Sequence, residues 1–373
     1  MNIEKSLSSV TYVALGLLAL LLPSSAVAAE REYLWDVAFS CDSTYVGTSG
    51  DHVRIYDFTT GKLLRVIEGD QVDALAFSPV EPGLFALGDK RGNVRLYRMN
   101  DETFLREFKA LRGDVRSLAF DKSGRYVAAT ARQATCKDPY LGEFRVWEIE
   151  MGKLIKSVDV KTGSMDGLSF SSDGELAAVC RYHRYKAGFV DIYRVANWEK
   201  VSSIKLFAGK ELEENQWGKA APRGATTKFT PDKKQLLVGG GIGVPADGQG
   251  YAHTCKPAAV LWRIDLTDLT LTRLFVDLEG ATCTAIDLSL DGKRVVSGNG
   301  LISMRNALDG SLVWSAQYAR GVASSPDGRF VVGCAQRPGP FFVPRGEAID
   351  HKEGLLVLDT KTGKTVRLIA KDE

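Results

Sequence analysis

Short apolar runs alternate with polar turns along most of the chain, and one kind of turn recurs seven times. In each copy an apolar run ends in a turn of the Ser-Pro-Asp-Gly type. The copies are Ala38–Ser43, Ala76–Gly83, Ala119–Gly124, Ser169–Gly174, Lys228–Lys233, Asp287–Gly292 and Ala323–Gly328. Counted from Phe39 in the first copy to Ser324 in the last, neighbouring copies are 36 to 59 residues apart. A repeat of about 40 residues with variable insertions is typical of small β-sheets arrayed around an axis.

A second motif, an apolar-alternating run closed by another polar turn, follows each copy. Its copies are Val53–Lys62, Val94–Thr103, Phe144–Lys153, Val190–Lys200, Ala259–Asp268, Ile302–Ser311 and Leu355–Lys364. Further apolar runs, such as Tyr126–Thr130 and Thr365–Ala370, lie between the motifs and after the second one. Four short strands per unit, with turns about every 8–12 residues, predict one antiparallel sheet per repeat. We therefore expect an all-β fold, a single seven-bladed β-propeller of four-stranded antiparallel blades, with Thr365–Ala370 as its last outer strand.

The chain resembles the Trp-Asp-repeat family of β-propellers over residues 33–371. The recurring turn and a strand that ends in Ile or Val, then Tyr or Trp, then a charged residue carry this resemblance. The chain departs from the family in having no Trp-Asp pair at the end of that strand and no Gly-His pair at the start of a repeat. The nearest pairs are Tyr56-Asp57, Trp147-Glu148 and Trp262-Arg263. The resemblance is therefore to a degenerate, bacterial-type member, akin to propellers of the quinoprotein and lactonase kind, without the family's Asp-His-Ser-Trp hydrogen-bond network.

The N-terminal segment has a composition unlike the rest of the chain. A lysine at position 5 precedes the 13-residue apolar run Val10–Leu22, and the small residues of Pro23–Ala29 follow it. These three parts are typical of a secretory signal, and the run is too short to favour a spanning helix. We expect residues 1–28 to be a cleaved signal peptide and residues 29–373 to form the propeller, with an uncleaved anchor as the alternative. The predicted location is periplasmic or secreted, without membrane insertion once the signal is removed.

The near balance of basic and acidic residues limits the kinds of partner that we expect. The chain has 48 basic and 46 acidic residues, a net charge of +2. Nucleic-acid-binding domains usually show a basic excess, so we expect no nucleic-acid partner. A protein or another component of the cell envelope is the expected partner, and a small-molecule ligand is the other option.

The longest predicted loops fall on one face of the propeller, which we call the top face. It is the face on which the second strand of a blade connects to the third and one blade connects to the next. The long connections are Ala131–Glu143, Arg181–Gly188, Phe207–Gly224, Gly239–Pro257 and Gln336–Gly354. Insertions on a rigid scaffold commonly carry function, and aromatic side chains contribute most to interfaces. The predicted binding residues on these loops are Tyr182, Tyr185, Trp217, Tyr251, Phe341 and Phe342. The alternative is that they pack the loops onto their own blades.

All four histidines and five of the six cysteines fall near the top face. None of them has the spacing of a metal site, so we predict no metal. An exported protein can hold disulfides, and Cys136–Cys180 and Cys255–Cys283 would join the tops of neighbouring blades. The glycine-rich Gly239–Gly243 is expected to be the base of a flexible loop rather than a phosphate-binding loop.

A second group of candidates lies four residues before the anchor of a turn, at the predicted mouth of the central channel. These are Trp35, Asp73, Arg116, Asp166, Thr284 and Arg320. Of these, Asp73, Arg116, Asp166 and Arg320 are charged and are predicted to bind a polar ligand, or else to pair with one another and with water. No nucleophile, phosphate-binding or zinc-protease motif is present, so we predict no catalytic residue and no cofactor.

Two functions remain open from the sequence. The first is an exported, Trp-Asp-repeat-like propeller that acts as a protein- or ligand-binding scaffold through its top-face loops. The alternative is a propeller enzyme or redox subunit, of the lactonase-like or amine-dehydrogenase-like kind, with its site over the central channel.

Overall fold

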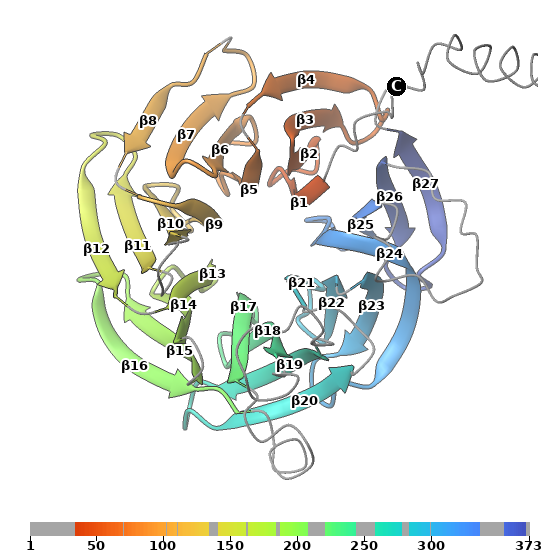
Figure 1. Ribbon diagram of the computed structural model, residues 1–373. Helices are drawn as coiled ribbons and strands as arrows, with labels where there is room; N and C mark the ends of the chain where they lie inside the picture. The colour runs from red at the N-terminus through yellow and green to blue at the C-terminus, as the bar shows by residue number, and fades with distance from the viewer. Residues whose placement is uncertain are drawn as a thin grey trace, which may run out of the picture. The chain divides into compact units, whose positions relative to one another are not determined.

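The computed structural model describes residues 34–69, 71–101, 103–109, 111–133, 141–161, 163–183, 187–207, 221–243, 258–277, 283–298, 300–335 and 354–370 (Figure 1). Tyr33–Glu373 form one compact unit, and Met1–Glu32, which contain the predicted signal, lie outside the described residues. The described part of the chain has 27 strands and no helix, and therefore no helix long and apolar enough to cross a membrane.

Five of the sheets are four-stranded, antiparallel and built from strands consecutive in sequence. The first consists of β1 Leu34–Phe39, β2 Tyr45–Gly50, β3 His52–Asp57 and β4 Leu63–Glu68; the second of β5 Val72–Phe77, β6 Leu84–Asp89, β7 Asn93–Arg98 and β8 Arg106–Lys109; the third of β9 Asp114–Phe120, β10 Tyr126–Gln133, β11 Leu141–Glu148 and β12 Leu154–Val160. The fourth consists of β13 Ser164–Phe170, β14 Leu176–His183, β15 Ala187–Arg194 and β16 Glu199–Lys205; the fifth of β17 Ala221–Phe229, β18 Gln235–Gly243, β19 Ala258–Asp265 and β20 Leu271–Asp277.

The last sheet has seven strands, joined at one long strand. It runs in the order β21 Ala285–Leu288, β22 Arg294–Gly298, β23 Gly300–Asn306, β24 Leu312–Ser324, β25 Phe330–Ala335, β26 Gly354–Asp359 and β27 Thr365–Ala370. β24 pairs with β23 through its first part and with β25 from Ala319 onward. Apolar side chains of the two halves face each other, as Val296 and Met304 pack in one cluster with Val331 and Leu358.

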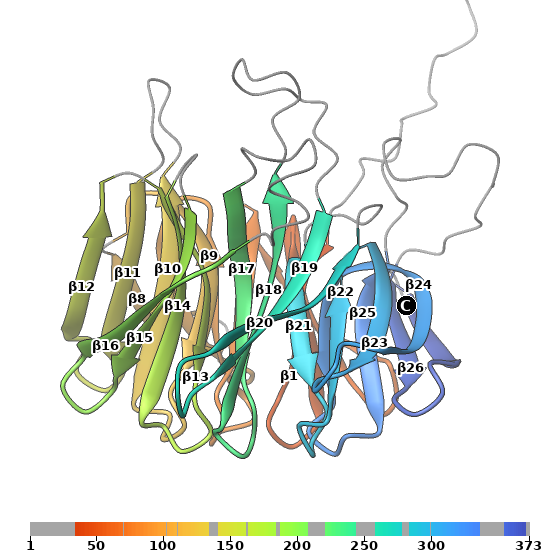
Figure 2. The ribbon, with the colours of Figure 1, turned by 90° about the horizontal axis from the view of Figure 1, so that it is seen from below.

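The sheets stand side by side in a ring, with the first strand of each nearest the axis (Figures 1 and 2). An apolar cluster fills each seam between neighbours, because both faces of these strands carry buried residues. At the seam that closes the ring, Leu34 and Val37 of β1 pack with Val332, Leu355 and Ile369. This arrangement of repeated antiparallel sheets is a β-propeller-like fold. β27 is the outermost strand at the C-terminal end, as the sequence predicts.

The recurring turn forms through its own side chains. In the fourth copy the Ser171 hydroxyl donates to the Asp173 carboxylate and accepts the backbone N–H of Leu176, and the residue after the aspartate has a left-handed φ of 79° at Gly174. Ser43 and Lys233 hold the same position in their copies, with φ of 63° and 62°. Left-handed backbone favours glycine, so the local chemistry accounts for the Asp-Gly preference.

Two strands are longer than the sequence suggests. Gly239–Gly243 belong to β18 instead of forming the base of a loop, and they pair with both β17 and β19. A side chain at Gly240 would place its Cβ 2.0 Å from the carbonyl oxygen of Arg223, so glycine here allows two strands to approach closely. β17 accordingly starts at Ala221, and it brings Arg223 into the innermost layer.

Candidate functional site

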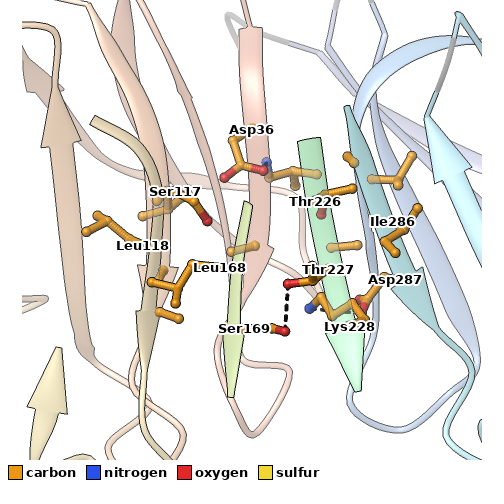
Figure 3. Close-up of a pocket in the computed structure, with 18 of the residues that line it drawn as sticks. Asp36, Ser117, Leu118, Leu168, Ser169, Thr226, Thr227, Lys228, Ile286 and Asp287 are labelled. Carbon is orange, nitrogen blue, oxygen red and sulfur yellow. Dashed lines mark hydrogen bonds and ion pairs between the residues drawn. The ribbon is translucent and has the colours of Figure 1, made fainter. Parts of the chain in front are cut away.

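A cavity of about 550 Å³ runs along the axis between the inner strands. Its wall contains residues of the inner strands β1, β5, β9, β13, β17, β21 and β24. Figure 3 labels wall residues of β1, β9, β13, β17 and β21. The inner strands begin at the top face and run along the axis toward the opposite face. Positions early in these strands therefore lie at the mouth of the cavity, and positions near their ends lie deeper.

A β-bulge sets the predicted mouth residues in place. Strand pairing skips one residue in β1 at Trp35, in β5 at Asp73 and in β9 at Arg116. The register also shifts at Asp166–Gly167 in β13, at Ala225 in β17 and at Arg320–Gly321 in β24. Bulges commonly occur beside functional sites, because the extra residue turns its side chain out of the ladder. Six of the seven repeats therefore carry the same local distortion four residues before the anchor, and Thr284 precedes β21 without one.

Asp166 and Arg223 form the tightest ion pair at the mouth. Asp166 Oδ1 lies 2.6 Å from Arg223 Nη2 and Asp166 Oδ2 lies 3.0 Å from Arg223 Nε, which is a bidentate contact. The Ser164 hydroxyl donates to the same carboxylate at 2.8 Å. Burial alone would raise the pKa of Asp166, but the adjacent Arg223 guanidinium, helped by Arg116 and Arg132, lowers it to about 2. Asp166 is therefore ionised, and its carboxylate is already paired with Arg223.

Asp73 and Arg116 form a second pair beside the first. Arg116 Nη1 lies 3.1 Å from Asp73 Oδ2, and Arg116 Nε lies 3.7 Å from Asp166 Oδ1. The Asp73 side chain is 8% exposed, and this burial raises its pKa although Arg116 and Lys90 oppose the shift. Three of the four charged residues predicted at the mouth, Asp73, Arg116 and Asp166, therefore pair with one another, which was one of the two roles expected for them.

Trp35 and Arg320 occupy the opposite part of the mouth. The Arg320 guanidinium lies 4.2 Å from the centroid of the Trp35 ring, and Lys90 Nζ lies 5.5 Å from it. Cations over an indole face are stabilised by the ring quadrupole. This sector joins β24, β1 and the β6–β7 turn, and it is more cationic than the paired sector formed by β9, β13 and β17.

A deeper layer contains charges that the sequence analysis missed. Lys228 Nζ lies 3.1 Å from Asp287 Oδ1, and Asp287 Oδ2 accepts the backbone N–H of Ser324 at 2.8 Å (Figure 3). The carboxylate of Asp36 accepts the N–H of Val37 at 2.9 Å. Desolvation raises the pKa of Asp36 to about 6, although backbone hydrogen bonds at Val37 and Leu75 and the charge of Lys228 lower it.

A comparison of the repeats with one another would have found these residues. Lys228 and Asp287 stand immediately before the anchor, where the other five copies have Ala or Ser. Asp36 stands three residues before the anchor, where the other copies have only Ala, Ser, Gly or Thr. The signal for a cavity-lining charge is a charged residue at a position where the other repeats have a small residue. Arg223 has no such signal, because it lies two residues before the bulge and depends on the extension of β17.

Cys180 and Cys283 are free thiols in the structure, and the two predicted disulfides stay predictions. Their predicted partners, Cys136 and Cys255, lie outside the described residues. Cys180 points toward the fifth sheet, where its thiol lies 3.9 Å from the carbonyl oxygen of Thr226, and away from the third sheet. Strand alternation explains this direction, since Val179 packs against the third sheet instead.

The predicted aromatic residues lie mostly beyond what the structure describes. Tyr182 lies in β14, and the Arg223 guanidinium is 5.9 Å from its ring centroid, so it adjoins the mouth. Tyr185, Trp217, Tyr251, Phe341 and Phe342 lie outside the described residues. Within the described ranges, no group of three His, Cys, Asp or Glu side chains is placed to hold a metal ion.

Comparison with known proteins supports the fold alone. No family model matches the chain, and no curated protein matches its sequence. Among solved structures, the chain is similar to a chain of hydrazine synthase from Kuenenia stuttgartiensis, with a TM-score of 0.68 and 13% sequence identity. The match covers 91% of this chain and 99% of that one. The similarity places the chain among proteins with a β-propeller-like scaffold. Identity this low does not transfer an activity.

Proposed function

We propose that this chain is an exported β-propeller of seven blades that acts as a binding scaffold and recognises its partner or ligand at the top face and the mouth of the central cavity. The observation that carries this proposal is the ring of bulged residues. Charged side chains from separate sheets converge on one cavity, and rigid inner strands hold them there. Such preorganised polar groups around a concave site are typical of recognition.

The blade count rests on β24. The seven-stranded sheet has apolar faces packed against each other across this strand, which supports two blades that share it. Five four-stranded sheets and two such blades make seven, the number of recurring turns in the sequence. Four of the described charged residues at the mouth, Asp73, Arg116, Asp166 and Arg223, are held in ion pairs of 2.6–3.1 Å. Occupied charges favour recognition over the proton transfers of the enzyme alternative.

Partner capture from envelope extract tests the binding face. Because β18 ends at Gly243 and β19 begins at Ala258, residues 244–257 can be replaced by a short turn without removing strand pairing. A second variant replaces both Phe341 and Phe342 by alanine. Leu290→Ala is the control, because Leu290 is exposed in a turn on the face opposite the top face. We expect unchanged melting in all three, and loss of capture of about tenfold or more in at least one top-face variant. Capture equal to the parent in both top-face variants would refute the proposal.

Export is tested by N-terminal sequencing of the protein from the envelope fraction. The small residues that end the leader support cleavage after Ala28 or Ala29, so the mature chain should begin at Ala29 or Glu30. An intact Met1 on soluble cytoplasmic protein would contradict it.

A further inference from the structure

The charges that line the cavity do not all cancel within the protein. Asp73 pairs with Arg116, and Asp287 pairs with Lys228. Among the described residues, Arg320 and Asp36 have no ion-pair partner within salt-bridge distance. They come from neighbouring inner strands, β24 and β1, which are in contact. The cavity therefore presents one guanidinium and one carboxylate on the same sector of its wall.

Buried polar atoms in the same cavity lack hydrogen-bond partners within the described residues. Asp73 Oδ1 and the Ser324 hydroxyl are buried and accept or donate no hydrogen bond, and buried Arg116 Nε has only a 3.7 Å ion-pair contact with Asp166. All three residues line the cavity. An unsatisfied buried polar group is costly, about 1–3 kcal/mol, and such groups are rare in folded proteins. These groups give the cavity wall polar atoms that a polar ligand could satisfy.

The order of these groups along the wall limits the chemistry of the occupant. Arg320 stacks on Trp35, Asp36 follows Trp35 in the chain, and Asp73 lies on β5, the next inner strand. The wall therefore runs from Arg320, over the Trp35 indole that Lys90 also adjoins, to Asp36 and to Asp73 with its partner Arg116. A phosphate dianion at Arg320 would be repelled by both carboxylates, whereas a molecule with one negative and one positive end would meet both kinds of group.

We propose that the cavity, from its mouth down to the layer of Asp36, binds a small zwitterion of the amino-acid class, with its carboxylate on Arg320, its ammonium toward the carboxylates of Asp36 and Asp73, and its apolar part against Trp35. This inference rests on the proposed function in taking the mouth as a recognition site. A guanidinium binds a carboxylate through two parallel hydrogen bonds. Asp73 Oδ1 would gain the donor that it lacks.

Isothermal titration of the mature protein tests the proposal. The probes are the proteinogenic amino acids, each at up to about 10 mM, a range that detects dissociation constants in the millimolar range. Lactate lacks the ammonium, propylamine lacks the carboxylate, and inorganic phosphate tests a simple anion site. We expect at least one amino acid to bind, and its matched hydroxy acid and amine to bind at least about tenfold more weakly, because each loses one charged contact.

Two variants and a control locate the site. Arg320→Gln and Asp36→Asn should each weaken binding of that amino acid by about tenfold or more. Arg329→Gln is the matched control, since Arg329 also lies over an aromatic ring, that of Phe330, but is not part of the cavity wall. It should bind as the parent does, and thermal melting should show that all three variants are folded.

Three results would overturn the proposal: no binding by any amino acid, equal binding of phosphate or lactate, or binding that Arg320→Gln leaves intact. Partner capture separates this failure from failure of the proposed function. If titration fails while the top-face variants still lose capture, the scaffold function stands and the zwitterion site does not.

Discussion

The buried cysteines show how a single side chain contacts the neighbouring sheet across a seam. Cys334 lies 3.4 Å from the carbonyl oxygen of Asp36 and Cys180 lies 3.9 Å from that of Thr226, each on the inner strand of the next sheet. Thr130 donates its hydroxyl to the carbonyl of Asp166 in the same way. Cys283 lies 3.7 Å from the carbonyl oxygen of Ala285 and fits against Gly239. These thiols act as small apolar residues with a weak donor.

Thiol reactivity provides a prediction at this scale. Cys180, Cys283 and Cys334 have no exposed surface, and burial raises the pKa of each thiol, to about 12 for Cys283. We expect all three to resist a thiol reagent in the folded protein and to react on unfolding, because the thiolate is the reactive form. Cys41, which is partly exposed, is the internal control and should react first. Peptide mapping without reductant reads out the result, and linked peptides containing Cys180 or Cys283 would show the disulfides instead.

The second prediction concerns the pH dependence that Asp36 confers. Its pKa is raised from 3.8 to about 6, so the folded state holds this proton more tightly than the unfolded state does. The associated stability is present below about pH 4 and is lost as the pH rises to about 6. We expect Asp36→Asn to be more stable than the parent at pH 8, by about 1–2 kcal/mol after allowance for its exposure to the cavity.

Denaturant unfolding of both proteins from pH 4 to pH 8 measures this effect. The difference should shrink toward pH 4, where Asp36 is protonated in the folded state and the unfolded carboxyl approaches its pKa of 3.8. The charge of Lys228 lowers the pKa of Asp36 and the charge of Asp287 raises it. Asp287→Asn therefore serves as a comparison variant that changes a neighbouring charge and leaves Asp36 in place. An advantage of Asp36→Asn that is the same at pH 4 and pH 8 would exclude titration of Asp36 as its cause.

At the scale of elements, the bulge of the inner strand is the feature that builds the site. It needs a small residue next to the turned-out one where two inner strands approach each other. A Cβ added at Gly167 would lie 2.5 Å from the Cα of Thr226, and one added at Gly321 would lie 3.0 Å from the Cα of Asp36. Both neighbours are backbone atoms and cannot move aside like a side chain.

The third prediction follows from this close approach. Gly167→Ala should destabilise the protein by about 2 kcal/mol or more, because inner strands β13 and β17 must separate. Gly83→Ala is the matched control, since its Cβ would meet Met99 Cβ at an ordinary 3.6 Å. That variant should lie within about 0.5 kcal/mol of the parent. Equal unfolding free energies for the two variants would show that the bulge tolerates a side chain.

At the scale of the whole molecule, stability depends on closing the ring. The first and last strands meet in one cluster, where Ile369 of β27 is 4% exposed and packs with residues of the first sheet. Arg367 also donates to the carbonyl oxygen of Thr59 across the same seam at 2.6 Å. Each sheet buries its faces only on its neighbours, so an incomplete sheet exposes the cores on both sides.

The fourth prediction is that a chain ending at Lys364, which lacks β27, should lose cooperative unfolding and expose apolar surface. A chain ending at Ala370 retains the strand and should unfold as the full chain does. Calorimetry and binding of an apolar dye measure both properties. Cooperative unfolding at the parental temperature after removal of β27 would show that ring closure does not depend on this strand.

The sequence by itself determined the repeat and the mouth positions. Turn chemistry and the two-residue period of a strand are local, so the recurring turn located the inner strands, and a fixed offset from it located Asp73, Arg116, Asp166 and Arg320. The bulge occurs at that same offset in six repeats, which is why counting residues was enough.

Only the tertiary structure decided which of these groups meet. Arg223 reaches Asp166 because β17 extends beyond its predicted start, and Lys228 reaches Asp287 because their sheets are neighbours in the ring. The direction of Cys180 toward the fifth sheet likewise depends on which face of β14 each neighbour covers. Contacts between sheets depend on register and ring closure, which involve residues far apart in sequence, and a local pattern carries no information about them.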